Sequence, residues 1–471
     1  MLPTFVGLFL IALLLFAHYS VTNKKKSLKL DIDEDLPFPA AGQGSSIFSL
    51  TALFGAYLAI LFVVGILAVL GLVVGTILGL SLIRYRSIKY KEYSFQKFLF
   101  EHFNTKDKSN VIFISLIAIT QILFATSELL LLKGVLSIGF QISSNYAAVI
   151  SVLLGMIVYF YSLTGGYLTV FRTDIVQFIA IISMCLVIIF HVIVSPPMVF
   201  SFKSLNILSL SWSLGITNSF IVYIFQIFWG IIMGFSFIIA SPDTWKRVFI
   251  SVKSRHKNQF LMLVLAGVLP FVVLLPLKFY YDPGNILSVA SLKFLISTII
   301  NENQLYLSIV LVGVISSFMS SFDSSLITSV HLFAINETRS STLSQVEDKK
   351  IFIKYMGINF LLINLMFIVI PGLSIKNLYF LPNLLIGAYA IIGGYLTGTR
   401  GLLSKLPLKS LLVVIIIGLV SWFIYLVSIP NIIEYPQVKQ IETVPYGILL
   451  FIIIVSYSFF FSKKDESIKN S

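Results

Sequence analysis

Charged residues are scarce in this chain. Only 11% of its 471 residues are Asp, Glu, Lys or Arg, whereas 58% are hydrophobic, and the mean hydropathy is +0.98. Because charged residues make up about a quarter of an ordinary soluble domain, this composition excludes a soluble globular protein. The longest polar stretches, residues 21–45, 85–109 and 336–352, are too short to form a hydrophobic core of their own. The function must therefore reside in the apolar part of the chain.

Cysteine and clustered histidine are also lacking. The single cysteine, Cys185, lies in an apolar run, which excludes a disulfide or a thiolate metal site within the chain. The histidines are scattered and show no spacing typical of a zinc site; they are His18, His102, His191, His256 and His331. No cluster of His, Asp and Glu and no Ser–His pairing suggests an active site. We therefore predict that the protein is not an enzyme.

Long apolar runs fill most of the sequence. They measure roughly 17–30 residues, enough for a helix to cross about 30 Å of hydrocarbon. We predict an all-α, polytopic membrane protein with about thirteen transmembrane helices, at residues 3–20, 46–64, 66–84, 110–138, 145–163, 173–195, 217–241, 259–278, 303–335, 353–372, 377–397, 408–429 and 445–462. The second and third runs form one stretch from Ile47 to Ile83, in which Gly65 or the segment Gly71–Gly75 is expected to carry the turn.

Lysine and arginine gather in every second loop between these runs. This alternation follows the positive-inside rule and explains the net charge of +13 without invoking nucleic acid. It places the N-terminus outside and the C-terminus in the cytoplasm of a cell that carries the protein in its plasma or inner membrane. The first apolar run precedes Lys24–Lys26 instead of following basic residues, so we interpret it as a retained helix and not as a signal peptide.

The segment Gly313–Val330 places hydroxyl groups and a carboxylate inside an apolar helix; it reads GVISSFMSSFDSSLITSV. Polar groups at bilayer depth are costly and usually mark a path for a substrate or an ion. The structural alternative is that small hydroxyl residues allow close helix packing. That alternative accounts equally well for Ser316, Ser317, Ser325 and Ser329. It explains Asp323 poorly, so an ion site is the favoured interpretation.

Four segments carry a resemblance to a known family. Residues Tyr161–Gln177 read YSLTGGYLTVFRTDIVQ, with a Gly–Gly pair followed by Thr–Asp and Gln. Residues 93–99 read YSFQKFL, residues 241–249 read SPDTWKRVF and residues 319–324 read MSSFDS. In this order they resemble the signature segments of the sodium:solute symporter family, with Lys246–Arg247 where the family usually has Gln–Arg. The resemblance spans roughly residues 90 to 400 of the chain.

The resemblance implies a leucine-transporter-like fold, a 5+5 bundle of two inverted five-helix repeats. The transporter core would span residues 46–398, with a peripheral helix and cytoplasmic linker at 1–45 and peripheral helices with a short tail at 399–471. The implied function is secondary active transport: sodium-coupled symport of a small organic solute across the bilayer by alternating access. Two alternatives stay open. One is a proton-coupled transporter that uses Glu128, Asp174 or Asp323; the other is a membrane protein that senses a solute without transporting it.

The resemblance also implies a sodium site. It assigns the side chains of Ser320 and Ser321, and the carbonyl groups of Ser317, Ala52 and Gly55, as ligands of the coupling ion Na⁺. In transporters built of inverted repeats, such oxygens lie where helices break near the midplane. The first core helix, residues 46–64, departs from the family pattern because it is apolar and is followed by a shorter connection.

Asp174 has two interpretations. The Gly165–Gly166 pair predicts a tight cytoplasmic turn, after which Asp174 would start the next helix and pair with Arg172, as carboxylates near a helix N-terminus do. The resemblance instead implies a carboxylate on the cytoplasmic exit route of the cation. The residues alone leave both open.

Four further side chains on two predicted helices are candidates for solute contact: Gln121, Glu128, Gln226 and Trp229. The first two are seven residues apart, so one helix face can carry both. The last two lie near Gly230 and Gly234, which are expected to permit a broken helix with exposed backbone. Interhelical hydrogen bonds and aromatic packing explain these residues equally well. Asp323 and Ser324 complete the candidate path, and the sequence does not name the solute.

Overall fold

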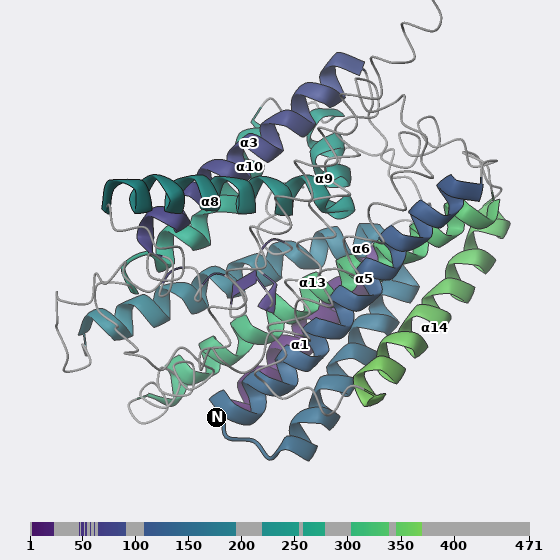
Figure 1. Cartoon of the computed structure of the whole chain (residues 1–471). Helices are drawn as coiled ribbons and strands as arrows, with labels where there is room; N and C mark the ends of the chain where they lie inside the picture. Colours follow the sequence, from purple (N-terminus) through teal and green to yellow (C-terminus); the bar gives the residue numbers. More distant parts are fainter. Residues whose placement is uncertain are drawn as a thin grey trace, which may run out of the picture.

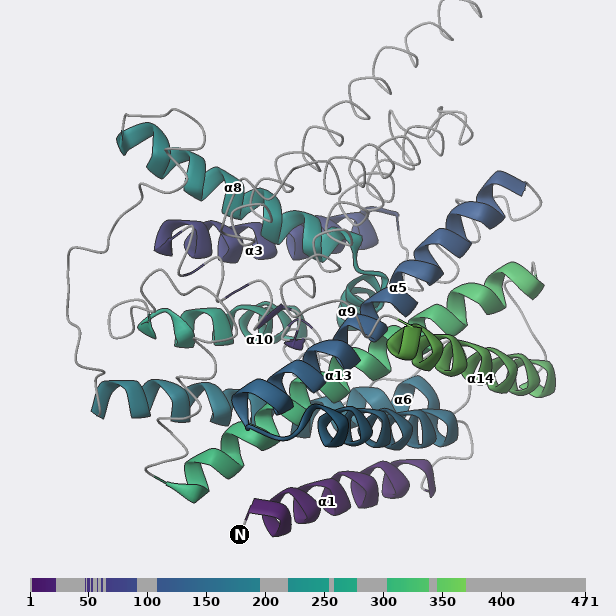
Figure 2. The same cartoon turned by 60° about the horizontal axis from the view of Figure 1, so that its bottom comes forward.

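The computed structural model describes residues 2–22, 65–90, 108–194, 219–253, 258–277, 303–338 and 345–369, together with positions 47, 49, 50, 52, 53, 57 and 61, which we call the first core segment. The described part is helical (Figures 1 and 2). Its elements are α1 (Leu2–Thr22), α3 (Ile66–Tyr90), α5 (Lys108–Gly134), the π-helix η3 (Val135–Gly139), α6 (Ser144–Val194), α8 (Ser219–Ala240), α9 (Pro242–Lys253), α10 (Gln259–Leu274), α13 (Gln304–Thr338) and α14 (Gln345–Val369).

Six segments in the described part are long and apolar enough to cross a membrane: Ile66–Ile88, Ile117–Gly139, Ser144–Tyr167, Thr169–His191, Gln304–Ala334 and Lys349–Val369. The prediction of an all-α fold with apolar, membrane-spanning helices is therefore confirmed for the described residues. The predicted helices at 377–397, 408–429 and 445–462 lie outside the described residues. The count of thirteen helices, the 5+5 repeat and the three-part domain division therefore stay predictions.

Helix α13 forms the centre of the bundle. Every residue from Val310 to Leu332 is buried, whereas a helix at the edge of a bundle keeps one exposed face. Helices α1, α5, α6 and α14 pack against it, and Figure 2 shows α13 lying between these neighbours. The serine-rich segment recognised in the sequence is therefore at the core of the molecule, where a hydroxyl group without a hydrogen-bond partner is costly.

Helices α3 and α8 touch through glycines. A Cβ atom added at Gly75 would lie 2.1 Å from the carbonyl oxygen of Ile231, and one added at Gly230 would lie 2.0 Å from that of Ala68. Small residues one turn apart let two helix backbones approach in this way, and Figure 1 shows the two helices crossing. The predicted break of α8 at Gly230 and Gly234 is wrong, because the helix runs without interruption from Ser219 to Ala240.

The turn that separates the first core segment from α3 is at Gly65, one of the two predicted places. Its φ of 120° is in a region that residues with a Cβ rarely adopt. The alternative place, Gly71–Gly75, lies inside α3, where these glycines contact α8. Close packing, and not a change of chain direction, is what the α3 glycines provide.

Helix α6 is broken at Gly166, which has φ 59° and ψ −156°. The break divides the helix into the apolar segments Ser144–Tyr167 and Thr169–His191. The predicted Gly–Gly turn is therefore present, although helical structure continues closer to it than predicted. Asp174 lies two turns beyond Gly166, and the macrodipole acts only within the first turn of a helix. The interpretation of Asp174 as a helix-start residue is wrong.

Residues 242–258, predicted as a loop, contain helix α9. It is inclined by 76° to α8 after a break at Ser241. Local sequence explains its start: the Ser241 Oγ accepts a hydrogen bond from the Thr244 backbone N–H at 3.3 Å, and Pro242 occupies the first helical position. Serine as N-cap and proline at the first position are both favoured there. The new helix carries two residues of the site, Asp243 and Arg247.

Candidate functional site

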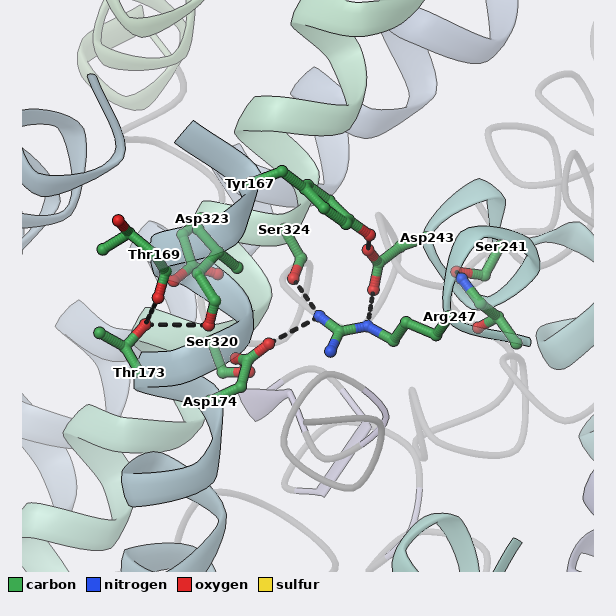
Figure 3. Close-up of polar contacts among 12 residues, drawn as sticks. Tyr167, Thr169, Thr173, Asp174, Ser241, Asp243, Arg247, Ser320, Asp323 and Ser324 are labelled. Atoms are coloured by element: carbon green, nitrogen blue, oxygen red, sulfur yellow. Dashed lines mark hydrogen bonds and ion pairs between the residues drawn. The ribbon is translucent and has the colours of Figure 1, made fainter. Parts of the chain in front are cut away.

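In the core of the protein, polar residues of α13 contact carboxylates of α5 and α6 and an arginine of α9. Figure 3 shows one half of this arrangement, in which side chains of α6, α9 and α13 converge. The second half lies around Glu128 of α5. In the described part of the chain, no group of three or more His, Cys, Asp or Glu residues is placed to hold a metal ion.

Arg247 is the positive centre of the first half. Its Nε donates to Asp243 Oδ2 at 2.7 Å, and one terminal nitrogen donates to Asp174 Oδ2 at 2.7 Å and to Ser324 Oγ at 2.9 Å (Figure 3). The side chains of Arg247 and Asp174 are fully buried. Asp243 and Arg247 lie one turn apart on α9, so they share a helix face. A buried arginine with two carboxylates avoids the cost of an isolated charge in the interior.

Asp174 connects α6 to both neighbours. While Oδ2 pairs with Arg247, Oδ1 accepts a hydrogen bond from the Ser320 Oγ at 2.6 Å. The ion pair of Asp174 is thus with Arg247 of α9, and not with Arg172 as the helix-start interpretation held. One carboxylate therefore joins three helices that are far apart in sequence.

Two tyrosines of α6 donate hydrogen bonds to the other two carboxylates of this half, those of Asp243 and Asp323. The Tyr167 hydroxyl donates to Asp243, and the Tyr161 hydroxyl donates to Asp323. The second oxygen of Asp323, Oδ1, has no hydrogen-bond partner among the described residues. Asp323 is thus held in the core by a neutral donor, unlike Asp174, which has a cationic partner.

Glu128 is the centre of the second half. Its Oε2 accepts a hydrogen bond from the Ser321 Oγ at 2.9 Å and one from the Leu50 backbone N–H at 3.0 Å. The Ser321 hydroxyl also lies 2.9 Å from the Ser317 carbonyl oxygen. The Ser317 hydroxyl itself is buried without a hydrogen-bond partner among the described residues. Oxygen groups from α5 and α13 therefore meet next to the first core segment.

The structure brings together many, but not all, of the predicted site residues. Eight of them lie in or beside the two halves of the cluster, and they are Ala52, Glu128, Asp174, Ser317, Ser320, Ser321, Asp323 and Ser324. Ala52 belongs to the first core segment, where its backbone N–H donates to Ser49 Oγ at 2.9 Å. Gly55 and the side chain of Trp229 lie outside the described residues.

The two other predicted solute contacts that the structure describes are Gln226 of α8 and Gln121 of α5. Gln226 is buried against the turn at Gly65, with its amide oxygen 3.4 Å from where a Cβ of that glycine would be. Gln121 is buried on α5, two turns before Glu128. Gln226 therefore contacts the turn before α3, and Gln121 lies on the helix that carries Glu128.

Four residues of the cluster were not among the predicted ones: Tyr161, Tyr167, Asp243 and Arg247. One signal for the last two was present in the sequence. SPDTWKRVF begins with an N-cap serine and places an acid and a base four residues apart, which is a helix pattern. For the tyrosines, no comparable signal exists, because an aromatic residue in an apolar run usually packs without using its hydroxyl group.

Comparison with known proteins finds similarity through the fold alone. No family model matches the sequence, and no curated protein matches it. A solved structure of a Na⁺-coupled sialic acid symporter, in its substrate-bound outward-open state, superposes with a TM-score of 0.63 at 15% identity, covering 96% of this chain and 95% of that one. A manganese transporter from Eremococcus coleocola superposes with a TM-score of 0.50 at 11% identity, covering 92% and 99% of the two chains. The chain thus shares its fold with solved membrane transporters over nearly its whole length.

Proposed function

We propose that this protein is a secondary active transporter that moves a small organic solute together with sodium by alternating access. The observation that carries the proposal is the pair Ser320 and Ser321, adjacent in the fully buried part of α13, each of which donates to a carboxylate of a different helix. Polar groups buried in a transmembrane bundle usually mark a substrate or ion path. The fold similarity to a Na⁺-coupled symporter supports the same conclusion.

The chemistry of these oxygens suits a hard monovalent cation. Hydroxyl and carbonyl oxygens replace water ligands without fixing a strong charge, and transporter ion sites are built of such groups near the membrane midplane. Ser320, Ser321 and the Ser317 carbonyl would supply them from α13. Ala52 and Gly55 would add carbonyl oxygens from the first core helix. The buried Ser317 hydroxyl, which has no partner among the described residues, is a further oxygen in reach of this helix face.

The solute would pass between α5, α8 and the cluster. We assign Gln121 of α5, and Gln226 and Trp229 of α8, to its path, with Asp174, Asp323 and Ser324 on the side toward α9. This assignment belongs to a 5+5 inverted-repeat core in residues 46–398. The core would sit in the cell membrane with the N-terminus outside and the C-terminus in the cytoplasm.

Alanine replacements of the two serines test sodium binding. Losing a ligand to a charged group costs about 1.5–3 kcal/mol, so Ser320→Ala and Ser321→Ala should each lower sodium affinity roughly ten- to a hundredfold. Ser325→Ala is the matched control, because Ser325 is a buried serine of the same helix outside both halves of the cluster. The measurement is radioactive sodium binding to purified protein, followed by uptake into proteoliposomes.

A thermal-shift screen would identify the solute. Purified protein would be heated with sugars, amino acids, carboxylates and vitamins, with and without sodium, because a specific binder raises the melting temperature by mass action. Uptake that ignores sodium but depends steeply on pH would replace the sodium proposal with proton coupling. A solute that binds, stabilises and never enters proteoliposomes would replace transport with sensing.

A further inference from the structure

A lysine of α9 and a histidine of α13 form a second polar contact between these two helices. The Lys246 Nζ lies 2.6 Å from His331 Nδ1. His331 is 6% exposed, and Lys246 is half-buried. We infer that this contact is sensitive to pH: a proton bound by His331 breaks it and loosens α9 from α13. The inference goes beyond the proposed sodium symport and does not depend on it.

The chemistry of the two groups decides which atom donates. A lysine binds its proton far more tightly than a histidine does, so Lys246 carries the positive charge. An ammonium group has three N–H donors and no acceptor, and an imidazole nitrogen accepts only while it carries no proton. Lys246 therefore donates to Nδ1, and His331 is neutral with its proton on Nε2. A second proton on this ring has to bind at Nδ1, the atom that accepts from the lysine.

Aromatic rings lie beside the pair. The centre of the His331 ring is 5.8 Å from that of Tyr167 of α6 and 6.3 Å from that of Phe352 of α14. The Lys246 Nζ lies 4.6 Å from the centre of the Tyr167 ring, a distance at which the ring face attracts a cation. The histidine thus packs against two other helices through rings, and Lys246 is the ionisable group whose charge acts on it.

Protonation of His331 would turn the attraction into repulsion. Two cations would then lie at hydrogen-bond distance in a site largely closed to water, where like charges repel far more strongly than in solution. Asp243 lies on the same helix as Lys246, but it is bonded to Arg247 and to the Tyr167 hydroxyl. The ammonium group would lose the acceptor that joins it to α13, and that side of α9 would loosen.

His331 lies near one end of the apolar part of α13. That segment runs from Gln304 to Ala334, so His331 is within one turn of its end and a proton need not cross the apolar core to reach it. In the proposed orientation, residues 242–258 lie in the cytoplasm, and the proton would come from that side. The bonds of Arg247 do not involve His331. The expected change is therefore a loosening of α9 and not its release.

His331→Asn and Lys246→Gln test the contact. Asparagine places an oxygen two bonds from Cβ, as Nδ1 is, so it accepts from Lys246 but binds no proton. Glutamine in place of Lys246 both donates and accepts, so it can bond either form of His331 without charge repulsion. Amide hydrogen exchange of α9, followed by mass spectrometry on the purified full-length protein, measures how often this helix opens.

At neutral pH the parent and both variants should exchange the amides of α9 at similar rates. As the pH is lowered, with all proteins compared at the same pH, exchange in the parent should become at least about tenfold faster than in either variant, as expected for the loss of a hydrogen bond to a charged group. His191→Asn is the control, because it removes another buried histidine, on α6. It should keep the response of the parent.

Equal exchange in the parent and in His331→Asn at every acidic pH would overturn the inference. A response like that of the parent in Lys246→Gln would overturn it as well, because repulsion from the lysine would not be the cause. If one variant fails to fold, the other gives the same test. Neither sodium nor a solute enters these measurements, so their outcome is independent of the sodium-binding experiments.

Discussion

Two contacts within the bundle are held in opposite ways. Between α3 and α8 the glycines bring backbone against backbone and leave no room for a Cβ atom: one added at Gly75 would lie 2.1 Å from the Ile231 carbonyl oxygen. Among α6, α9 and α13 the helices are joined by side chains: an arginine, two aspartates and two serines. In a bilayer, where lipid is as apolar as leucine, van der Waals contact and polar bonds are the two ways left to hold helices together.

Only the glycine contact departs from what the sequence suggested. Glycines on α8 were expected to break the helix, and they pack it against α3. On α13, the hydroxyl groups of Ser320, Ser321 and Ser324 bond to charged groups of other helices. Ser329, for which packing was an equal alternative, bonds to the Leu326 carbonyl oxygen and to Asn359.

The largest loss of stability should come from replacing Arg247, the arginine that joins α9 to α6 and α13. Arg247→Met leaves Asp174 and Asp243 buried without their cation, and breaking a buried ion pair costs about 3–5 kcal/mol. Thermal unfolding in detergent should show a large fall in melting temperature. Adding Asp174→Asn should recover part of it by removing one of the two uncompensated charges. Arg84→Met is the control, because Arg84 is exposed. A melting temperature unchanged in Arg247→Met would mean that the polar contact is not a structural one.

Disrupting the glycine contact between α3 and α8 should lower the stability of the protein by a smaller amount. Gly75→Ala puts a methyl group 2.1 Å from the Ile231 carbonyl oxygen, so α3 and α8 must separate. Overpacking of this kind costs about 1–3 kcal/mol, visible as a lower melting temperature. Gly357→Ala serves as the matched case, since the nearest atom to its added Cβ is the Tyr159 hydroxyl at 4.0 Å. There the substitution should be neutral or raise stability by up to about 1 kcal/mol. Equal effects at both positions would rule out a tight contact.

The smallest loss of stability is expected from a charged contact at the surface, the ion pair of Lys354 and Glu337. Lys354 pairs with Glu337 at 3.0 Å, both side chains being well exposed. Hydrogen bonds from Tyr355 and Lys354 lower the pKa of Glu337 below its usual value. A lowered folded-state pKa gives stability that is present above the unfolded-state value and is lost as pH falls through the folded-state value.

Lys354→Met tests this contact. Because solvent screens exposed ion pairs, it should cost at most about 0.5 kcal/mol at neutral pH. The difference from the parent protein should vanish in acid once Glu337 is protonated in both. Melting temperatures measured across this range check the sign. A difference that grows toward low pH would contradict the assigned pairing.

The sequence predicted elements well where apolar length alone decides them. The run at 303–335 became α13, Gln304–Thr338, and the run at 110–138 became α5 and η3 together. Membrane helices are readable in this way because every backbone polar group must be satisfied within the segment. Helix α9 was missed because it is short and polar, so its apolar content resembled that of a loop.

Partner choice could not be predicted from the sequence. Asp174 and Arg247 are 73 residues apart, and nothing local tells a carboxylate which distant cation it will meet. Arg172 was the nearer candidate in sequence. The position of Ser320 and Ser321 on a buried helix was foreseeable from the apolar residues around them. The carboxylates that they bond to became visible only when α5, α6 and α13 were placed together.

The hydrogen bonds of Arg247 have a mechanical consequence. If α9 moved away from α6 and α13, the guanidinium would leave both Asp174 and Ser324, and a buried charge would lose a partner at the cost given above for a broken ion pair. These bonds therefore oppose any separation of α9 from α6 and α13. The break at Ser241, where α9 turns by 76° from α8, lies outside the bonded group. A movement that bends the chain there would leave the hydrogen bonds of Arg247 intact.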